Sequence, residues 1–521
     1  MQASEAPGAH AGEPRTVGDG PYERLILRRA ILIDGSGAPP YGPVDIVIER
    51  NRITALWVHP PLGGPRLQPP EPPRCGPDGK EIDLDGKYVL PGFVDAHGHI
   101  GWPGHVPNAQ YVYDLWLAHG VTTVREPGCF INGLEFVARE SERSNRNEIA
   151  APRILPYAGF GLDRQAPFET PQDAAKWVQE MAESGAQGLK LWGYRAEILH
   201  ATIEEARGLG LGTMCHHQQL YVADADALQT ARWGLDSIEH WYGIPEAMLS
   251  TSRLQRFPAT YNYQRERARF AEAGQLWSQA ARPGSQRWND TVDAFVQTGV
   301  TLDPTFGVYV GLRDAVRVQR QPWHEDYTAE TLWRYWQPDS GGHGSFFEDW
   351  GTEEESAWRV NMRLWMDFVA EFYARGGRVT AGTDPGSIFT LFGFAYPQEL
   401  ELLREAGLSA LEVLRSATLE GARLLGMEGS IGIVEPGKLA DLVVLDRNPL
   451  ADLKAIYADT SAVADGTSTV ANDTSAVADG TSTRGVKLTV KDGILYDPAV
   501  LLRRVRDAVR ASRDTVRADR D

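Results

Sequence analysis

From Tyr88 onward, short apolar segments alternate with longer segments of helical periodicity, and this alternation constrains the fold more than any other feature. Such alternation is typical of parallel βα units. Several predicted strands follow a glycine that can end the preceding helix, as at Gly120, Gly299 and Gly377. The eight predicted strands cover residues 88–96, 121–125, 153–157, 188–191, 212–215, 236–239, 300–303 and 378–383. This pattern predicts an α/β fold built on a (β/α)8 TIM barrel.

Both flanks of the predicted barrel are rich in β-type sequence. Residues 21–87 contain short Val/Ile/Leu runs separated by turn residues, and residues 430–498 contain a strand entry and a hairpin turning at Asp492-Gly493. We expect the two flanks to pair into one small β-sandwich domain, with the barrel, residues 88–429, inserted in it. The barrel is expected to carry long loops at 241–298 and 306–376.

Three further segments differ from the rest in composition. Residues 1–20 are rich in Gly, Ala, Pro and Glu, and predict a disordered tail. Residues 459–469 recur unchanged at 473–483, so we expect a flexible repeat insertion at 459–483. Residues 499–521 interleave arginines with aspartates and predict a charged C-terminal helix, solvated or packed against a partner.

The net charge of −18 argues against nucleic-acid binding, which needs a basic face. No apolar run approaches the length of about 18 residues that a membrane span requires. Three cysteines provide no disulfide framework and favour a reducing compartment, hence a cytoplasmic location, with export of a processed chain left open. The expected partner is a small-molecule substrate, and a homo-oligomer is left open.

The first predicted barrel strand ends in His97-Gly98-His99. Because side chains alternate along an extended strand, His97 and His99 point to the same face. Two imidazoles on one face suit a divalent metal ion. The alternative for the isolated pair is two surface histidines after a strand.

Other predicted strands end in residues of the same chemical kind. Barrel enzymes hold their chemistry at the carboxyl ends of the strands. Reading those ends along the chain gives Lys190, His216, His240 and Asp384, in the segments Gly-Leu-Lys-Leu-Trp, Gly-Thr-Met-Cys-His, Asp-Ser-Ile-Glu-His and Ala-Gly-Thr-Asp.

Taken in this order, the motifs resemble the amidohydrolase superfamily of metal-dependent hydrolases, in its imidazolonepropionase- and prolidase-like branch. The resemblance covers nearly the whole chain, from residues 33–35 to residues 435–441. It implies a binuclear centre holding two divalent ions, zinc by default. The implied ligands are His97, His99 and Asp384 for the first ion, His216 and His240 for the second, and Lys190 bridging the two as its N-carboxylate.

The implied activity is hydrolysis of an amide, peptide or cyclic amide C–N bond, with dipeptidase and carboxypeptidase types included. A metal-bridged hydroxide would attack, Asp384 would shuttle the proton, and His240 and Lys190 would complete the catalytic group. The alternatives on the same site are a deaminase and a lactone, carbamate or organophosphate ester hydrolase. Lys190 weighs against a deaminase, because deaminases of the superfamily usually hold one metal and lack this lysine. The complete set of six ligand-type residues disfavours a non-catalytic scaffold.

Substrate contacts are less constrained by sequence. His217 follows a predicted ligand and can either contact substrate or pack outward, whereas Trp241 and Tyr242 follow His240 directly. Arg125 and Glu126 are expected to support the barrel mouth. The aromatic-rich segment 306–376 is expected either to cover the metal site or to form an outer helical layer.

Overall fold

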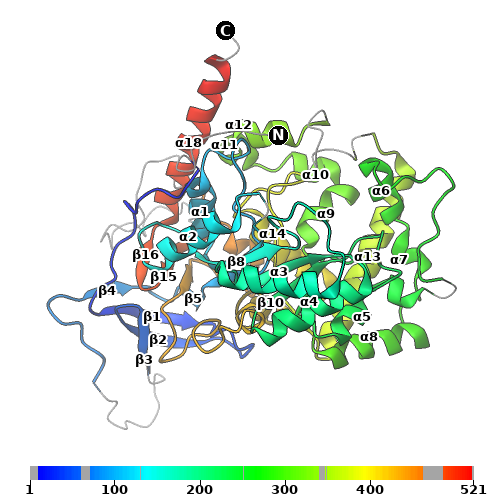
Figure 1. The fold of residues 1–521 in the computed structure, drawn as a ribbon. Helices are drawn as coiled ribbons and strands as arrows, with labels where there is room; N and C mark the ends of the chain where they lie inside the picture. Colours follow the sequence, from blue (N-terminus) through cyan, green and yellow to red (C-terminus); the bar gives the residue numbers. More distant parts are fainter. Residues whose placement is uncertain are drawn as a thin grey trace.

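The computed structural model describes residues 10–59, 71–129, 131–249, 252–338, 347, 349–460 and 485–518. These residues form a mixed α/β fold with two sheets (Figure 1). One sheet is parallel and carries the strand ends named above. The other combines strands from both ends of the chain.

The parallel sheet is curled and its strands pair in chain order, each with the next. Its members are β6 (Phe93–Asp95), β7 (Val121–Gly128), β8 (Arg153–Gly159), β9 (Gly188–Trp192), β10 (Gly212–His216), β11 (Ser237–Glu239), β12 (Thr301–Asp303) and β13 (Arg378–Val379). Two backbone hydrogen bonds link the segments that follow its first and last strands. The N–H of Ala96 donates to the carbonyl of Ala381 over 2.9 Å, and that of Asp384 donates to the carbonyl of His97 over 2.7 Å.

Helices connect these strands or follow the last one; most bury one face, and α1 is buried on all sides. They include α1 (Ala109–Ala118), α2 (Leu134–Asn145), α3 (Pro171–Glu183), α4 (Ala196–Gly208), α5 (Ala227–Arg232), α8 (Gln286–Thr298), α13 (Thr352–Ala374) and α14 (Ala395–Ala406). Local sequence explains their ends: α3 begins with Pro171 and a capping box between Thr170 and Asp173. Helix α8 ends at Gly299, whose φ of 75° is left-handed.

Two long connections add an outer helical layer. Between β11 and β12 lie η1 (Glu246–Met248), α6 (Glu266–Ala273) and α7 (Leu276–Gln279); between β12 and β13 lie α9 (Phe306–Arg313), α10 (Ala315–Gln319), α11 (His324–Tyr327) and α12 (Glu330–Tyr335), ahead of α13. Tryptophans of α13 join the two connections, because Trp358 and Trp365 pack against Trp241 with ring centroids 5.8 and 6.0 Å apart.

The second sheet is where the two chain ends meet. Its strands are β1 (Leu25–Leu32), β2 (Tyr41–Glu49), β3 (Arg52–Val58), β4 (Lys80–Asp83), β5 (Tyr88–Pro91), β14 (Leu442–Leu445), β15 (Val486–Lys491) and β16 (Ile494–Tyr496). Antiparallel pairing of β5 with β14 joins the N-terminal and C-terminal parts. The predicted hairpin is present as β15 and β16. The pairing forms one continuous sheet, so a two-layer sandwich remains an expectation.

The predicted strand at 88–96 is instead two strands in two different sheets, β5 and β6, separated by Gly92. The N–H of Gly92 donates to the carbonyl of Asp441 over 2.7 Å, which holds this point at the small sheet. A Cβ atom on Gly92 would lie 2.2 Å from Oγ1 of Thr122. Only glycine therefore lets the chain pass this closely from one sheet to the other.

The prediction of a disordered tail over residues 1–20 is wrong for residues 10–20. Their backbone groups have fixed partners, which composition does not reveal: Gly12 donates to Oε2 of Glu140 over 2.7 Å, and Asp19 bridges to Leu495. Residues 1–9 lie outside the described residues. The predicted repeat insertion, 459–483, lies outside them as well, apart from its first two residues.

The C-terminal part contains α15 (Ala410–Arg415), the π-helical turn η3 (Ser416–Glu420), α16 (Gly421–Leu424), η4 (Leu453–Ile456) and α18 (Pro498–Ala518). Figure 1 shows α18, in red, running alongside α1, α11 and α12, which it contacts. Among the helices of the described ranges, none combines the length and apolar character of a bilayer crossing. The three cysteines, Cys75, Cys129 and Cys215, are free thiols.

Candidate metal centre

The residues predicted as metal ligands lie together. All six line one cavity of about 590 Å³ at the carboxyl ends of the parallel strands: His97, His99, Lys190, His216, His240 and Asp384. They come from β9 and β10 or from the segments that follow β6, β11 and β13. Strand ends that are far apart in the sequence therefore deliver nitrogen and oxygen donors to a single space.

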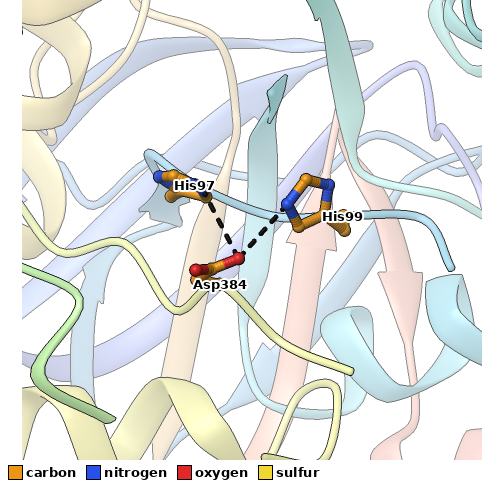
Figure 2. Close-up of side chains that lie close together, drawn as sticks. All are labelled: His97, His99 and Asp384. Carbon is orange, nitrogen blue, oxygen red and sulfur yellow. Dashed lines mark ion pairs between the residues drawn. The ribbon is translucent and has the colours of Figure 1, made fainter. Parts of the chain in front are cut away.

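Three of these side chains form the closest group (Figure 2). Oδ1 of Asp384 lies 3.2 Å from Nε2 of His99 and 3.6 Å from Nε2 of His97. The glycine between the histidines is required here, because a Cβ atom on Gly98 would lie 2.5 Å from Cγ1 of Val124. Asp384 has a left-handed backbone, with φ of 47°, and its N–H donates to the carbonyl of His97.

The other three side chains adjoin this group. Nε2 of His240 lies 3.7 Å from Oδ2 of Asp384, and its Nδ1 lies 2.5 Å from the hydroxyl of Thr305. The imidazole of His216 is 4.6 Å from that of His240 between ring centroids. Nζ of Lys190 lies 3.4 Å from Nε2 of His97.

These separations fit donors arranged around divalent ions. Two ligands, each about 2.1 Å from a tetrahedral ion, are about 3.4 Å apart. Oxygen atoms of Asp384 lie 3.2, 3.6 and 3.7 Å from Nε2 of His99, His97 and His240, and Nζ of Lys190 lies 3.4 Å from Nε2 of His97. Imidazole and carboxylate are also ligands that zinc accepts.

Burial keeps most of the imidazoles neutral, which is the form that binds a metal. It lowers the pKa of His97 to about 4 and that of His240 to about 3, and it holds the pKa of His216 well below the usual value. Burial also lowers the pKa of Lys190, opposed by the carboxylates of Glu239 and Asp384.

Asp384 and His99 carry opposite charges. Burial raises the pKa of Asp384, but the neighbouring His97 and His99 lower it by more, so it lies well below its usual range. Burial lowers the pKa of His99, but hydrogen bonds to Asp384 and Glu126 outweigh it and raise the pKa to about 9. Asp384 is therefore an anionic group facing the cavity at neutral pH.

A buried ionic network lies behind His97. Oε2 of Glu239 is 2.6 Å from Nδ1 of His97, while Oε1 of Glu239 accepts hydrogen bonds from Arg125 over 3.0 Å and from Ser237 over 2.6 Å. Oδ2 of Asp303 is 3.4 Å from Arg125. His97, Glu239 and Asp303 also have the spacing of a metal group, but the guanidinium of Arg125 already supplies the positive charge there.

Sequence reasoning missed Glu239 as a functional residue, although it precedes the predicted ligand His240. Its place at the carboxyl end of β11, where the other candidate residues also lie, was the available signal. Arg125 and Glu126, expected as supporting residues, contact the segment that carries the two histidines: Arg125 donates to the carbonyl of Ala96 over 2.5 Å. Oε1 of Glu126 lies 3.5 Å from Nδ1 of His99, and its Oε2 accepts the backbone N–H of Cys129 over 2.9 Å.

Of the three predicted substrate contacts, only Tyr242 lines the cavity, where its ring stacks near His216 at 6.0 Å. His217 points away from the cavity, because it follows His216 on an extended segment, and its Nε2 lies 2.9 Å from the hydroxyl of Thr230 in α5. Trp241 is fully buried in the helical layer against α13.

Both long connections contribute to the cavity wall. Tyr263, Arg269 and Phe270 come from the first, and Val308, Tyr309 and Tyr335 come from the second. The tryptophans of segment 306–376 pack elsewhere. Trp336 donates to the carbonyl of Gly386 over 3.1 Å, and Trp323 stacks on Phe394 at 5.0 Å. The segment therefore forms part of the wall through smaller aromatic residues, while its tryptophans build the outer layer.

Comparisons with known proteins agree with this geometry. The model of the amidohydrolase family matches residues 367–495. The imidazolonepropionase of Symbiobacterium thermophilum is 23% identical over 466 residues, which cover 84% of this chain and 89% of that protein.

Solved structures share the fold over almost the whole chain. A putative prolidase from Bifidobacterium longum has a TM-score of 0.61 at 19% identity and covers 94% of this chain and 99% of that one. A bottromycin amidohydrolase has a TM-score of 0.62 at 20% identity and covers 94% of this chain and 91% of that one. The family match, the relative that spans most of the chain and the shared fold agree, and together they support the amidohydrolase superfamily for this chain.

Proposed function

We propose that this protein is a binuclear metal-dependent hydrolase that cleaves an amide, peptide or cyclic amide C–N bond. One observation carries the proposal. Six side chains with metal-binding chemistry line one cavity, and nitrogen atoms of His97, His99 and His240 lie 3.2 to 3.7 Å from the carboxylate of Asp384, as expected around divalent ions. The names of the relatives, imidazolonepropionase, prolidase and amidohydrolase, favour the same bond type.

The proposal extends to the architecture. The hydrogen bonds from Ala96 to Ala381 and from Asp384 to His97 support closure of the curled sheet into a full (β/α)8 barrel. Closure would explain why the first and last strand ends share one site. The small sheet formed by both chain ends would fold over as the β-sandwich domain. Free thiols at all three cysteines support a reducing, cytoplasmic location.

Two divalent ions, zinc by default, would be held by His97, His99 and Asp384 on one side and by His216 and His240 on the other. When bound, the ions would acidify a water molecule and polarise the scissile carbonyl. Lys190 would bridge the ions as its N-carboxylate. An ammonium beside two cations would be repelled, whereas the neutral amine favoured by burial can take up carbon dioxide and become anionic.

Asp384 would move the proton during hydrolysis. Its carboxylate is ionised at neutral pH and faces the cavity, so it can accept a proton from the attacking water. It would then donate that proton to the leaving nitrogen, which departs as an amine. His240 lies 3.7 Å from Oδ2 of Asp384 and is itself held by Thr305, so it keeps this oxygen oriented.

The test is a substrate panel with the metal-loaded protein. Dipeptides, N-acyl amino acids, lactams and lactones would be assayed with and without a chelator, and ammonia release would be measured in parallel. We expect chelator-sensitive hydrolysis of at least one amide class without free ammonia. Activity restricted to lactones or other esters, or ammonia release by deamination, would overturn the proposal.

A further inference from the structure

We propose that the C-terminal helix α18 positions Tyr335 in the wall of the cavity and that Tyr335 thereby determines which substrates fit. The selectivity part of this proposal rests on the proposed hydrolase function, whereas the positioning part does not. Tyr335 is the last residue of α12, and it lines the same cavity as the six metal-ligand candidates.

Helices α11 and α12 depend on their surroundings for their position. They comprise four and six residues, and helices of this length are not stable by themselves in water. What they pack against therefore decides where Tyr335 lies. One support comes from α1, where the hydroxyl of Tyr111 donates to the carbonyl of Tyr327 over 2.5 Å.

A second support comes from the hydrogen bond of Trp336 to Gly386, and helix α18 supplies a third through polar contacts. Nη2 of Arg506 lies 3.3 Å from Oδ2 of Asp326 and 3.2 Å from the hydroxyl of Tyr327. Arg513 donates to the carbonyl of Glu325 over 2.5 Å. Ser512 accepts the backbone N–H of Glu330 over 3.4 Å, at the start of α12. The arginines on this face of α18 thus bind the short helix α11, and are not directed to solvent.

The body of α18 is anchored independently of these contacts. Leu501, Leu502, Val505 and Val509 are buried, and Nε of Arg504 lies 3.1 Å from Oδ2 of Asp114 in α1. Arg506 and Arg513 can therefore be changed without removing the apolar face that holds the helix. Figure 1 shows the helix continuing past α11 and α12, so both lie along its length.

Residues of α12 contact His105 and Trp102, next to the cavity. The hydroxyl of Thr331 donates to the carbonyl of His105 over 2.6 Å. The ring of Tyr335 lies 3.7 Å from that of His105 and 5.4 Å from that of Trp102, measured between centroids. Trp102 also lines the cavity, so Trp102 and Tyr335 form one section of its wall, with His105 packed against both rings.

A double variant tests the positioning. Arg506→Ala/Arg513→Ala should raise amide hydrogen exchange in residues 324–336 at least about tenfold, because local opening becomes easier. Arg510→Ala is the matched control, since Arg510 is an exposed arginine of the same helix. Ser512→Ala is a milder variant and should raise exchange only near the start of α12. Unchanged exchange in the double variant, or equal changes in the control, would overturn the proposal.

The selectivity part is tested with the same proteins. The double variant and Tyr335→Ala should both change the ratio of kcat/KM between aromatic and small aliphatic substrates at least about threefold, mainly through KM, with metal content unchanged. An unaltered ratio in Tyr335→Ala would refute the selectivity role. Altered exchange in a protein without hydrolase activity would instead refute the proposed function and leave the positioning role standing.

Discussion

Nδ1 of His97 lies 2.6 Å from Oε2 of Glu239, and both side chains are almost completely excluded from solvent. Glu239 accepts the Nδ1–H, which directs the lone pair on Nε2 of His97 towards Asp384 and Lys190. Arg125 balances the charge of Glu239 from behind, at 3.0 Å. Such outer partners commonly fix the orientation of a metal-binding histidine.

We therefore predict that Glu239→Gln weakens metal binding. The amide would present an N–H₂ group to either His97 or Arg125, and affinity should fall about 10- to 100-fold. Competition with a chromophoric chelator measures this loss directly. Glu142→Gln, at an exposed position of α2, is the matched control and should bind metal normally. Equal affinities for both variants would show that Glu239 does not support the site.

Lys190→Ala should lose metal as well as activity, because it removes the proposed bridge between the two sets of histidines. We expect at least one ion per chain to be lost and kcat to fall ~100-fold or more. A short carboxylic acid should restore part of the activity by occupying the space left by the side chain. Lys176→Ala, on the exposed face of α3, is the control. A Lys190→Ala protein with full metal content and normal turnover would refute the bridging role.

Asp384→Asn should reduce kcat by about 10²- to 10⁴-fold, because an amide cannot accept the proton from the attacking water. Metal content is measured on the same samples, so that lost turnover can be compared at equal occupancy. Asp367→Asn, in a surface ion pair of α13, should leave kcat unchanged. Near-normal turnover of a fully loaded Asp384→Asn enzyme would assign the proton transfer to another group.

Stability should depend on pH through Glu399, which accepts the backbone N–H groups of Phe306 and Gly307 over 3.0 and 2.7 Å. Burial raises its pKa from 4.5 to about 8, outweighing these bonds. The folded state therefore binds the proton more tightly than the unfolded state, and the free energy of unfolding falls as pH rises from about 4.5 to about 8.

Urea unfolding near pH 5 and about pH 9 compares the wild type with Glu399→Gln. The wild type should lose more stability than the variant between these values, by at most about 5 kcal/mol, since each pKa unit corresponds to about 1.4 kcal/mol. Parallel losses in the two proteins would mean that Glu399 titrates normally. The effect matters for the cavity, because α9 carries Val308 and Tyr309 in its wall.

The ligand candidates could be predicted from sequence because each is set by local rules. Alternation turns His97 and His99 to one face, and the parallel order of the strands brings Lys190, His216 and Asp384 to the same edge of the sheet. For these residues, the position along a predicted strand is enough to predict that the side chain faces the cavity. The same rule leaves His217 undecided, and its direction away from the site appears only with its partner Thr230.

Other features depend on contacts between distant segments, which periodicity does not encode. The sequence around Gly92 predicts the interior of one strand. In the structure, contacts with Asp441 and Thr122 fix Gly92 at the point where the chain crosses from one sheet to the other. Arg125 and Glu239 are buried charged residues 114 positions apart in the sequence. Their pairing, and with it the support of His97, cannot be inferred from either position alone. The order of residues 10–20 likewise depends on distant partners, such as the side chain of Glu140, which accepts the backbone N–H of Gly12.

Metal stoichiometry in active protein tests the central claim most directly. Purified protein would be analysed for bound divalent ions, stripped with a chelator, and titrated with zinc while metal content and amide hydrolysis are followed together. We predict about two ions per chain in fully active protein, loss of hydrolysis on stripping, and recovery that saturates at two equivalents. Full activity with one ion per chain, or in protein free of metal, would contradict the binuclear centre.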